Sequence, residues 1–438
     1  MRSVIFAGIM AVVLLGVVGP VLSSQETADP NKLQQINDYL RYASLNNAQL
    51  KAEFEKFKVA IEQIPQAGSL ADPEFTYGYF IEEVETRTGP QRQKFELRQK
   101  FPWFGVIEAR TDEAAAAAKA AHKRYQAKKL ELFEQVKYTF YEFSYLAKAI
   151  EITEENLELI IHFEQVARAR YQAAITSHPD IIRAQIELAI MEDRLKSLKE
   201  LTPAITAELN SILNRPASSE LPWPKQSEYK TVTINFDQLY NLILQNNPQL
   251  QAVDYDIQAA RNKYTLAKKK SFPNFALGVS YIDTANAIGS GVDDSGKDPV
   301  MAMISLTLPI WTDNYKAAQR QAQAKVWQKG HEKMQMENTF AAEAKNLLYQ
   351  FEDTTRKIAL YRNVIIPKAR EMLAASETAY RAGSIGFLSL IDAQRELLKY
   401  ELYYHRTLAE RSQKLAMIET LAGTSLPIIN NTVSVKKK

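Results

Sequence analysis

The segment YQAAITSHPDIIRAQIEL, residues 171–188, recurs in a similar form as YRAGSIGFLSLIDAQREL, residues 380–397. Two further pairs of segments keep nearly the same spacing, namely LNNAQL (45–50) with QNNPQL (245–250) and KFPWFG (100–105) with TLPIWT (307–312). Self-similarity over a period of roughly 200 residues is typical of a duplicated architecture. We therefore interpret the chain as two copies of one unit, of which the second carries a small insertion.

Both copies show the same order of predicted elements, which is a helix, a β-hairpin and a long helical hairpin. Residues 106–178 contain no Gly and no Pro. A straight helix of about 70 residues would extend on the order of 100 Å and needs lateral partners in a bundle or coiled coil. The predicted segments are a signal peptide (1–23), a first repeat (24–214), a linker (215–235), a second repeat (236–423) and a C-terminal tail (424–438).

Each long helical arm also contains a proline away from its turn, Pro203 in the first copy and Pro367 in the second. A proline inside a helix removes one hydrogen bond and kinks or breaks the helix. We therefore predict irregular structure at both positions.

The composition excludes several classes of function. The 438 residues include no Cys, which excludes disulfides, thiolate metal sites and a Cys nucleophile. The 54 basic and 51 acidic side chains nearly balance, so no basic patch indicates a nucleic-acid partner. Arg2, the apolar run after it and the small residues near Ser24 predict a cleaved signal peptide. The alternative is an N-terminal membrane anchor, which would need a longer apolar core. Past Ser24 no apolar run reaches the roughly 18 residues of a transmembrane helix, so a mature membrane protein would have to use β-strands.

Two segments in each copy alternate apolar and polar residues over about nine positions, a length that lets a tilted strand cross a bilayer. They form the predicted β-hairpins at about 75–101 and 274–308. A soluble sheet with one face on a core is the alternative. One face of the second strand requires water, because it consists of Lys94, Glu96, Arg98 and Lys100. Since four strands cannot close a barrel, a membrane protein of this kind must be an oligomer.

The order of these segments resembles the TolC family of outer-membrane efflux proteins over nearly all of the mature chain. The resemblance is carried by the helix starts NNAQL and NNPQL, the strand exits KFPWFG and TLPIW, and the two turn-and-return segments. Also similar is IIPKAREMLAASETAYRAG (365–383), an arm that leads to a Tyr-x-x-Gly turn and then to FLSLIDAQREL. Residues 78–105 resemble the heavy-metal-efflux branch of the family.

This resemblance implies an α+β membrane protein with an internal duplication. The family forms a homotrimer whose protomers each give four strands to a 12-stranded β-barrel in outer-membrane lipid, continued by an α-helical tube in the periplasm. It also implies an exit duct of a tripartite efflux or type I secretion system. The implied partners are a periplasmic adaptor (membrane fusion protein) and an inner-membrane transporter of the RND or ABC type.

The resemblance also places candidate site residues at the two helix turns. Asp392 aligns with a family Asp that narrows the pore, and its alternative is a solvated helix residue. Asp180 is the second candidate, and its alternative is an ordinary helix N-cap. The family's other Asp is Ser389 here, and a latch Arg of some members is Ile385, so the gating network departs from the family pattern. The adaptor-contact candidates are Ser177, His178, Pro179, Gly383, Ser384, Ile385 and Gly386.

No residues favour an enzyme. The chain has no GxSxG and no phosphate-binding Gly loop, and the His331-Glu332 pair lacks the second His of a zinc-protease motif. We interpret His331, Met334 and Met336 as a solvated or packed helix face. No catalytic residue, metal ligand or cofactor is predicted. The alternative function is a periplasmic coiled-coil adaptor or scaffold without a pore, which leaves four membrane-length strands unexplained.

Overall fold

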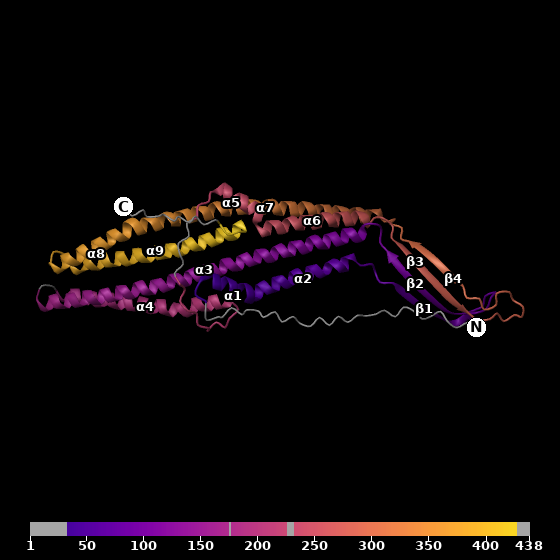
Figure 1. Cartoon of the computed structure of the whole chain (residues 1–438), viewed down its shortest axis with the longest axis horizontal. Helices are drawn as coiled ribbons and strands as arrows, with labels where there is room; N and C mark the ends of the chain where they lie inside the picture. The colour runs from indigo at the N-terminus through magenta and orange to yellow at the C-terminus, as the bar shows by residue number, and fades with distance from the viewer. Residues whose placement is uncertain (1–32, 175–176, 226–231, 427–438) are drawn as a thin grey trace, which may run out of the picture.

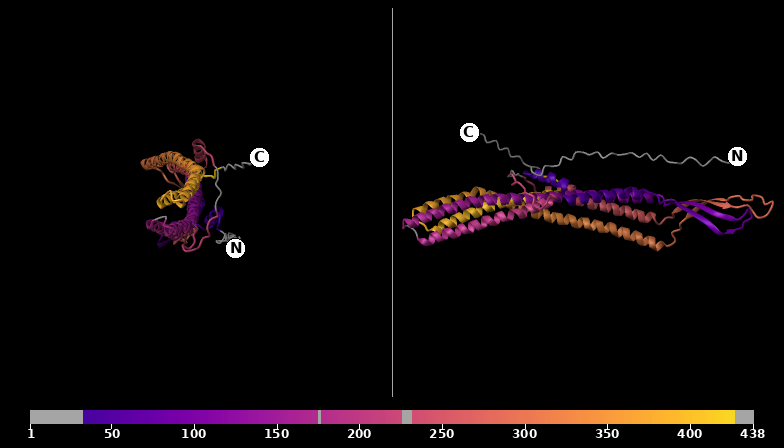
Figure 2. Two further views of the ribbon diagram at one scale, coloured as in Figure 1. Left: turned by 90° about the vertical axis from the view of Figure 1, so that its left-hand side faces the viewer. Right: turned by 90° about the horizontal axis from the view of Figure 1, so that it is seen from below.

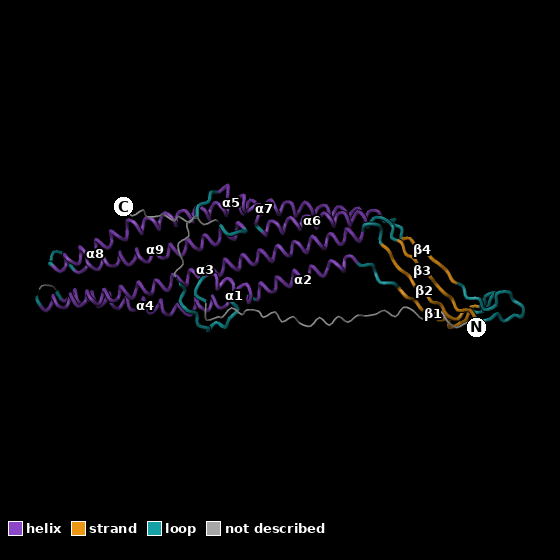
Figure 3. Tube along the Cα trace, viewed as in Figure 1, coloured by secondary structure: helices purple, strands orange, loops and turns teal. Residues whose placement is uncertain are grey.

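The computed structural model describes residues 33–174, 177–225 and 232–426. The predicted signal peptide lies outside the described residues, as do residues 226–231 of the predicted linker and nearly all of the predicted C-terminal tail. The described residues form a long array of helices with a β-sheet at one end (Figure 1, Figure 3). Seen along the long axis, the helices form an open, curved array (Figure 2).

The two halves of the chain place similar elements in the same order. The first half consists of α1 (Ile36–Asn46), α2 (Ala48–Gly68), β1 (Glu74–Val84), β2 (Gln91–Phe101), α3 (Val106–Gln172) and α4 (His178–Ile212). The second half consists of α5 (Phe236–Asn246), α6 (Pro248–Lys269), β3 (Phe275–Thr284), β4 (Val300–Leu306), α7 (Thr312–Leu360), the π-helical turn η2 (Tyr361–Ile365), α8 (Ile366–Arg381) and α9 (Phe387–Ala422). Within the described ranges, none of the helices is long and apolar enough to span a membrane.

The length of α3 follows from its sequence. The helix lacks Gly and Pro, and its Ala-rich first turns have high intrinsic helix propensity. Gly105 precedes it in the left-handed conformation, at φ 74°, which lets the chain turn sharply out of the sheet. Further along, Phe140 and Phe143 are buried in a cluster that includes Tyr39 of α1 and Leu209 of α4. The longest helix is therefore stabilised by neighbours from its own half of the chain, and it also packs against α6 and α9 of the second half.

The repeated NNxQL motif has the same structural role in both halves. Asn47 separates α1 from α2, and Asn247 separates α5 from α6. Each Asn side chain accepts a hydrogen bond from a backbone N–H at the start of the following helix, and so caps it. Each amide also donates a hydrogen bond of 2.8 Å to the end of a return helix, Asn47 to the carbonyl of Ile212 and Asn247 to that of Leu421. One side chain thus ties a helix start to a helix end.

The sheet has the strand order β1-β2-β3-β4, and all neighbouring strands are antiparallel. Pairing of β2 with β3 joins the two halves of the chain into one sheet (Figure 3). In this register, Arg98 of β2 lies opposite Glu74 on one side and Gly278 on the other. The register fixes which residues share a face, because side chains alternate along each strand.

The two prolines of the long arms behave differently. Pro367 is the second residue of α8, which begins directly after η2, so the predicted irregularity is present in the second half. Pro203 lies inside α4, which continues without a break, so the prediction for the first half is wrong. The physical reason is solvent exposure. Pro203 cannot donate the helical hydrogen bond to the carbonyl of Lys199, but both residues face solvent, where water can bind the freed carbonyl.

Candidate functional site

Two turns between helices lie at the end of the molecule that is farthest from the sheet (Figure 1). One turn connects α3 to α4 and the other connects α8 to α9, and residues 175–176 of the first lie outside the described residues. We call this end the tip. It brings together the residues singled out in the sequence, which are Ser177, His178, Pro179, Asp180, Gly383, Ser384, Ile385, Gly386 and Asp392.

The α8–α9 turn is tight and well defined. Gly383 adopts φ 79°, and its N–H donates to the carbonyl of Tyr380 at 3.0 Å. The N–H of Ser384 donates to the carbonyl of Ala379 at 3.0 Å, and together the two bonds form a Schellman motif. A side chain other than Gly would be strained at the left-handed position. The turn therefore has one defined geometry.

The α3–α4 turn is built differently. Ser177 occupies the N-cap position of α4 in an extended conformation, and its side chain makes no capping hydrogen bond. Asp180 lies in the first turn of α4, where a carboxylate interacts favourably with the helix dipole, and it is 3.8 Å from Arg183. The N-cap alternative for Asp180 is therefore wrong, because α4 begins at His178, two residues before it.

Arg170 connects the two turns. It lies in the last turn of α3, and its guanidinium stacks 4.5 Å from the ring centroid of Tyr380, which is 1% exposed. A Cβ added to Gly383 would come within 3.4 Å of the Arg170 Nη2 atom. Cation–π contacts of this kind stabilise by about 0.5–2 kcal/mol, depending on desolvation. The end of α3 therefore packs directly against the α8–α9 turn.

Asp392 lies in the second turn of α9, next to an ion pair that joins the two helical hairpins. Its side chain is 59% exposed and lies 3.7 Å from Arg395. Arg395 in turn binds the carboxylate of Glu187 on α4, with its Nε atom 3.1 Å from both oxygens. Hydrogen bonds to Glu187 are the main cause that raises the pKa of Arg395. Since the Glu187 side chain is only 5% exposed, this is a largely buried contact between α4 and α9.

A second polar contact between the hairpins lies beside this ion pair. The Nε2 atom of Gln394 on α9 donates to the Oδ1 atom of Asn156 on α3 at 2.9 Å, and both residues are buried. Sequence reasoning missed Arg170, Glu187, Arg395 and this amide pair. The only available signal was the alignment of Gln185 with Gln394 in the repeated segment, which shows similarity but not which helix each side chain faces.

The sheet at the opposite end has two unlike faces. On one face, apolar and aromatic side chains are exposed, including Ile81 at 93% and Ile304 at 76%. The exposed members of this outer face are Phe75, Tyr77, Tyr79, Ile81, Leu97, Leu277, Val279, Tyr281, Val300, Ile304 and Leu306. The other face carries the charged residues of β2. A bare apolar face backed by a charged one is typical of strands with lipid outside and water inside.

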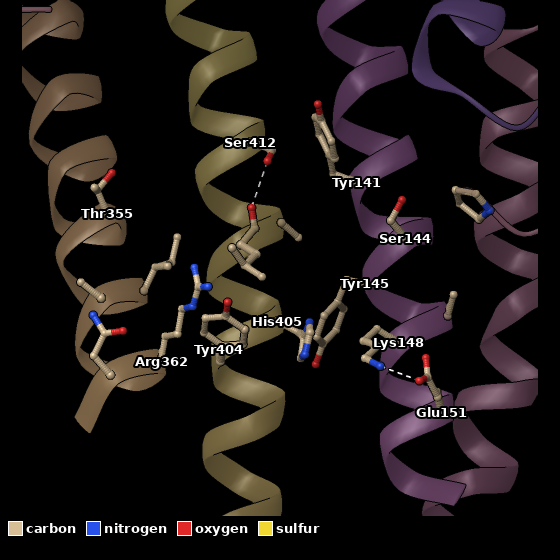
Figure 4. A pocket seen from close by; sticks show the side chains of 17 residues that line it. Tyr141, Ser144, Tyr145, Lys148, Glu151, Thr355, Arg362, Tyr404, His405 and Ser412 are labelled. Carbon is tan, nitrogen blue, oxygen red and sulfur yellow. Dashed lines mark hydrogen bonds and ion pairs between the residues drawn. The ribbon is translucent and has the colours of Figure 1, made fainter. Parts of the chain in front are cut away.

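A groove of about 640 Å³ lies between α3, α9 and the α7–η2 segment (Figure 4). His405 of α9 and Tyr145 of α3 both line it. Burial lowers the pKa of His405 to about 4, and the nearby Lys148 adds to the lowering. His405 is therefore neutral at physiological pH and acts as a packing group of the groove wall.

The described part of the chain contains no cluster of three or more His, Cys, Asp or Glu residues that could hold a metal ion. His331 and Met334 are exposed on α7, and Met336 packs at the edge of a hydrophobic cluster.

Long helical hairpins that end in a sheet with an exposed apolar face are typical of a protein whose strands lie in a membrane. The chain belongs to the outer membrane efflux protein family, whose family model matches residues 40–215 and 239–424. The family consists of transport proteins of the outer membrane and is not an enzyme family.

Several known proteins are similar to the chain. Nodulation protein T of Rhizobium leguminosarum bv. trifolii is 21% identical over 409 residues, which cover 89% of this chain and 85% of that protein. An uncharacterized protein of Haemophilus influenzae is 26% identical, and that match spans 45% of this chain and only 43% of the relative. The solved outer membrane protein VceC of Vibrio cholerae has the same fold, with a TM-score of 0.73 at 16% identity, covering 90% of this chain and 97% of that chain.

Proposed function

We propose that the chain is one protomer of a homotrimeric exit duct in the outer membrane. Three copies join their four-stranded sheets into a closed 12-stranded β-barrel, and the helices continue as a tube into the periplasm. Head-to-tail contacts between identical chains close into such a ring when the rotation between copies matches. In this arrangement each of the two repeats, bounded at residues 24–214 and 236–423, contributes one hairpin to the barrel and one to the tube.

The observation that carries the proposal is the sheet, which has an exposed apolar face and two unpaired edges. Within the described residues, β1 pairs only with β2, and β4 pairs only with β3. Unpaired strand edges tend to associate with further strands, and an apolar face of this size requires cover. Pairing of the β4 edge of one copy with the β1 edge of the next satisfies the edges, and lipid covers the face.

The helical part supports the same assembly. Ile182, Ile186 and Ile190 recur every four residues on α4 and are 44%, 54% and 52% exposed. Residues four apart lie on one face of a helix, so these side chains form an apolar stripe that nothing in the described protomer covers. Val364 and Met372 are exposed on the other side of the array, at 52% and 44%. A neighbouring copy would cover the stripe on α4.

The tip is the proposed periplasmic entrance of the duct. There the Asp392 carboxylate would line the opening, and the turns that contain Ser177 and Gly383 would contact the periplasmic adaptor, which connects the duct to an inner-membrane transporter of the RND or ABC type. Asp180 is a weaker candidate for the lining, because its side chain is only 13% exposed. Membership in the efflux family favours this duct over a scaffold without a pore. The similarity to the heavy-metal-efflux branch stays a prediction about the cargo.

Membrane fractionation and gel mobility test the proposal together. The mature protein should be in the outer-membrane fraction and should run as a trimer that heating converts to a monomer. Ile186→Asp should weaken the trimer, because it places a charge in the apolar stripe. Lys196→Ala is the matched control, since Lys196 is on the same helix but its side chain is 73% exposed. A soluble monomeric mature protein would contradict the proposal.

A further inference from the structure

In the part of the sheet with regular register, the charged face carries three basic side chains (Lys94, Arg98 and Lys100) and two acidic ones (Glu74 and Glu96). On this face, the long charged side chains of β2 are paired with small residues of β3 such as Gly278 and Ser280. In the proposed duct, which this inference takes as its basis, this charged face lines the water-filled lumen. The lumen wall therefore receives its fixed charge mainly from one strand of each protomer.

Ion pairs on this face account for all but one of the charges in the regular register. Lys100 is 2.5 Å from Glu74 of β1, and Lys94 is 2.9 Å from Glu96 on its own strand. Arg98 makes no hydrogen bond or ion pair within the sheet, all of whose residues the structure describes. It lies opposite Glu74, with which it interacts electrostatically but whose carboxylate is hydrogen-bonded to Lys100. On its other side it lies opposite Gly278, which has no side chain.

We propose that Arg98 is a selectivity-determining residue, which forms a cationic ring on the barrel wall and favours the passage of anionic solutes. A threefold axis repeats each residue at the same height, so one Arg98 per protomer becomes three guanidinium groups around the lumen. Rings of like charge along a pore raise the local concentration of the opposite ion. Guanidinium groups also bind carboxylates and phosphates in bidentate fashion, so the favoured solutes include molecules that carry these groups.

Ionic strength sets the conditions under which the ring acts. Fixed charges are screened over about 30 Å at 0.01 M salt but over only about 3 Å at 1 M. A lumen wide enough for efflux cargo is therefore influenced by the ring at low salt and hardly at high salt. This dependence separates an electrostatic role of Arg98 from a purely structural role, which would not follow the salt concentration.

The test is the permeability ratio of chloride to potassium for the purified trimer in planar lipid bilayers, measured from the reversal potential under a potassium chloride gradient. Arg98→Gln should lower the ratio about two-fold at low salt, and Arg98→Glu should lower it further, with both effects lost near 1 M. Arg98→Lys should keep the wild-type ratio. Lys297→Gln is the control, since it removes one charge per protomer in the β3–β4 loop, beyond the paired strands.

The outcomes separate this inference from the proposed function. If the channels form normally but wild type, Arg98→Gln and Arg98→Glu have the same permeability ratio at low salt, the role of Arg98 is overturned. The proposed duct is unaffected by that result. A wild-type trimer that forms no channels overturns the duct and, with it, the ring. An equal change of the permeability ratio in Lys297→Gln also overturns the inference, because the selectivity would then depend on the total charge of the protein and not on the position of Arg98. Substitution is tolerable at Arg98, because its side chain is on the water-facing side of the sheet.

Discussion

The return helices of the two halves, α4 and α9, begin from similar sequences but have different surroundings. α9 packs between α3 on one side and α7 and α8 on the other, so Phe387, Leu390 and Leu398 are almost fully buried. α4 packs mainly on α3, and its apolar stripe around Ile186 stays exposed. The difference shows that one half of the molecule supplies an interior helix and the other an edge helix. In the proposed trimer, a neighbouring copy would cover this edge.

The largest expected effect comes from the asparagines that hold the ends of these two helices. Asn247→Ala should lower the free energy of unfolding by about 3 kcal/mol, since it removes a helix cap and leaves the Leu421 carbonyl unpaired in a buried site. Asn47→Ala should cost about 1–2 kcal/mol, because Asn47 is only half-buried and water can reach its partners. Thermal unfolding followed by circular dichroism, at one protein concentration, measures both.

Asn247→Asp serves as a control for the hydrogen bond to Leu421. It keeps an oxygen that can cap α6 but sets a second acceptor against the Leu421 carbonyl in a buried site, so its cost should be at least that of Asn247→Ala. Equal losses for Asn47→Ala and Asn247→Ala would contradict the idea that the interior helix depends more strongly on its anchor than the edge helix does.

The second effect concerns the ion pair that connects α4 to α9. Arg395→Gln should destabilise the protein by about 2 kcal/mol, because it leaves the buried Glu187 carboxylate without its cation. The value is below the usual cost of breaking a buried pair, since the Arg395 side chain is 49% exposed. Arg395→Lys should recover only part of the loss, because an ammonium cannot reproduce the bidentate contact.

A double variant makes this measurement specific. Glu187→Gln together with Arg395→Gln removes both charges and should be more stable than Arg395→Gln alone, as measured by thermal unfolding. If the double variant is the less stable of the two, the contact does not act as a buried pair, and the edge and interior helices are joined by apolar packing alone.

Much of the fold could be predicted, because it depends on sequence patterns that are compatible with only one kind of secondary structure. The run without Gly or Pro after residue 105 predicts α3, and the alternation of apolar and polar residues in 75–84 and 275–283 predicts strands. The pairing of Glu187 with Arg395 could not be predicted in this way. Glu187 lies four residues after Arg183, a spacing that favours an ion pair within α4. Only the tertiary packing of α4 against α9 places Glu187 next to Arg395 instead. The N-cap alternative for Asp180 is wrong for a related reason, because Ser177 and Asp180 are both good N-cap residues and the sequence does not show at which of them α4 begins.

The third effect contrasts His405 of α9 with Lys196, which occupies the corresponding position of the edge helix α4. Because the pKa of His405 is about 4 in the folded chain and near its usual 6.5 in the unfolded chain, the unfolded chain binds the proton more strongly. Stability is therefore complete above pH about 6.5 and falls as the pH drops towards 4. The loss at pH 5 should be about 1 kcal/mol, since His405 keeps some contact with solvent.

Unfolding measured between pH 5 and 8 tests this contrast. His405→Gln should flatten the dependence in this range, whereas Lys196→Gln should leave it unchanged, because the Lys196 side chain is 73% exposed. A wild-type profile that His405→Gln does not alter would mean that burial in the groove does not control the protonation of His405.

The last prediction concerns the two aspartates of the tip, Asp392 and Asp180. Their substitution should have the smallest effect on stability and the most direct effect on transport. The Asp392 side chain on α9 is 59% exposed, whereas that of Asp180 on α4 is 13% exposed. If Asp392 lines the entrance, Asp392→Asn should change single-channel conductance by about two-fold at low salt and weaken block by added Mg²⁺, because a carboxylate ring concentrates cations. Asp180→Asn should change neither quantity in the same bilayer recordings.

Unchanged conductance and block in Asp392→Asn would remove Asp392 from the entrance. A larger change in Asp180→Asn would place the opening beside the edge helix. Either result would mean that exposure in the protomer does not predict which return helix faces the pore.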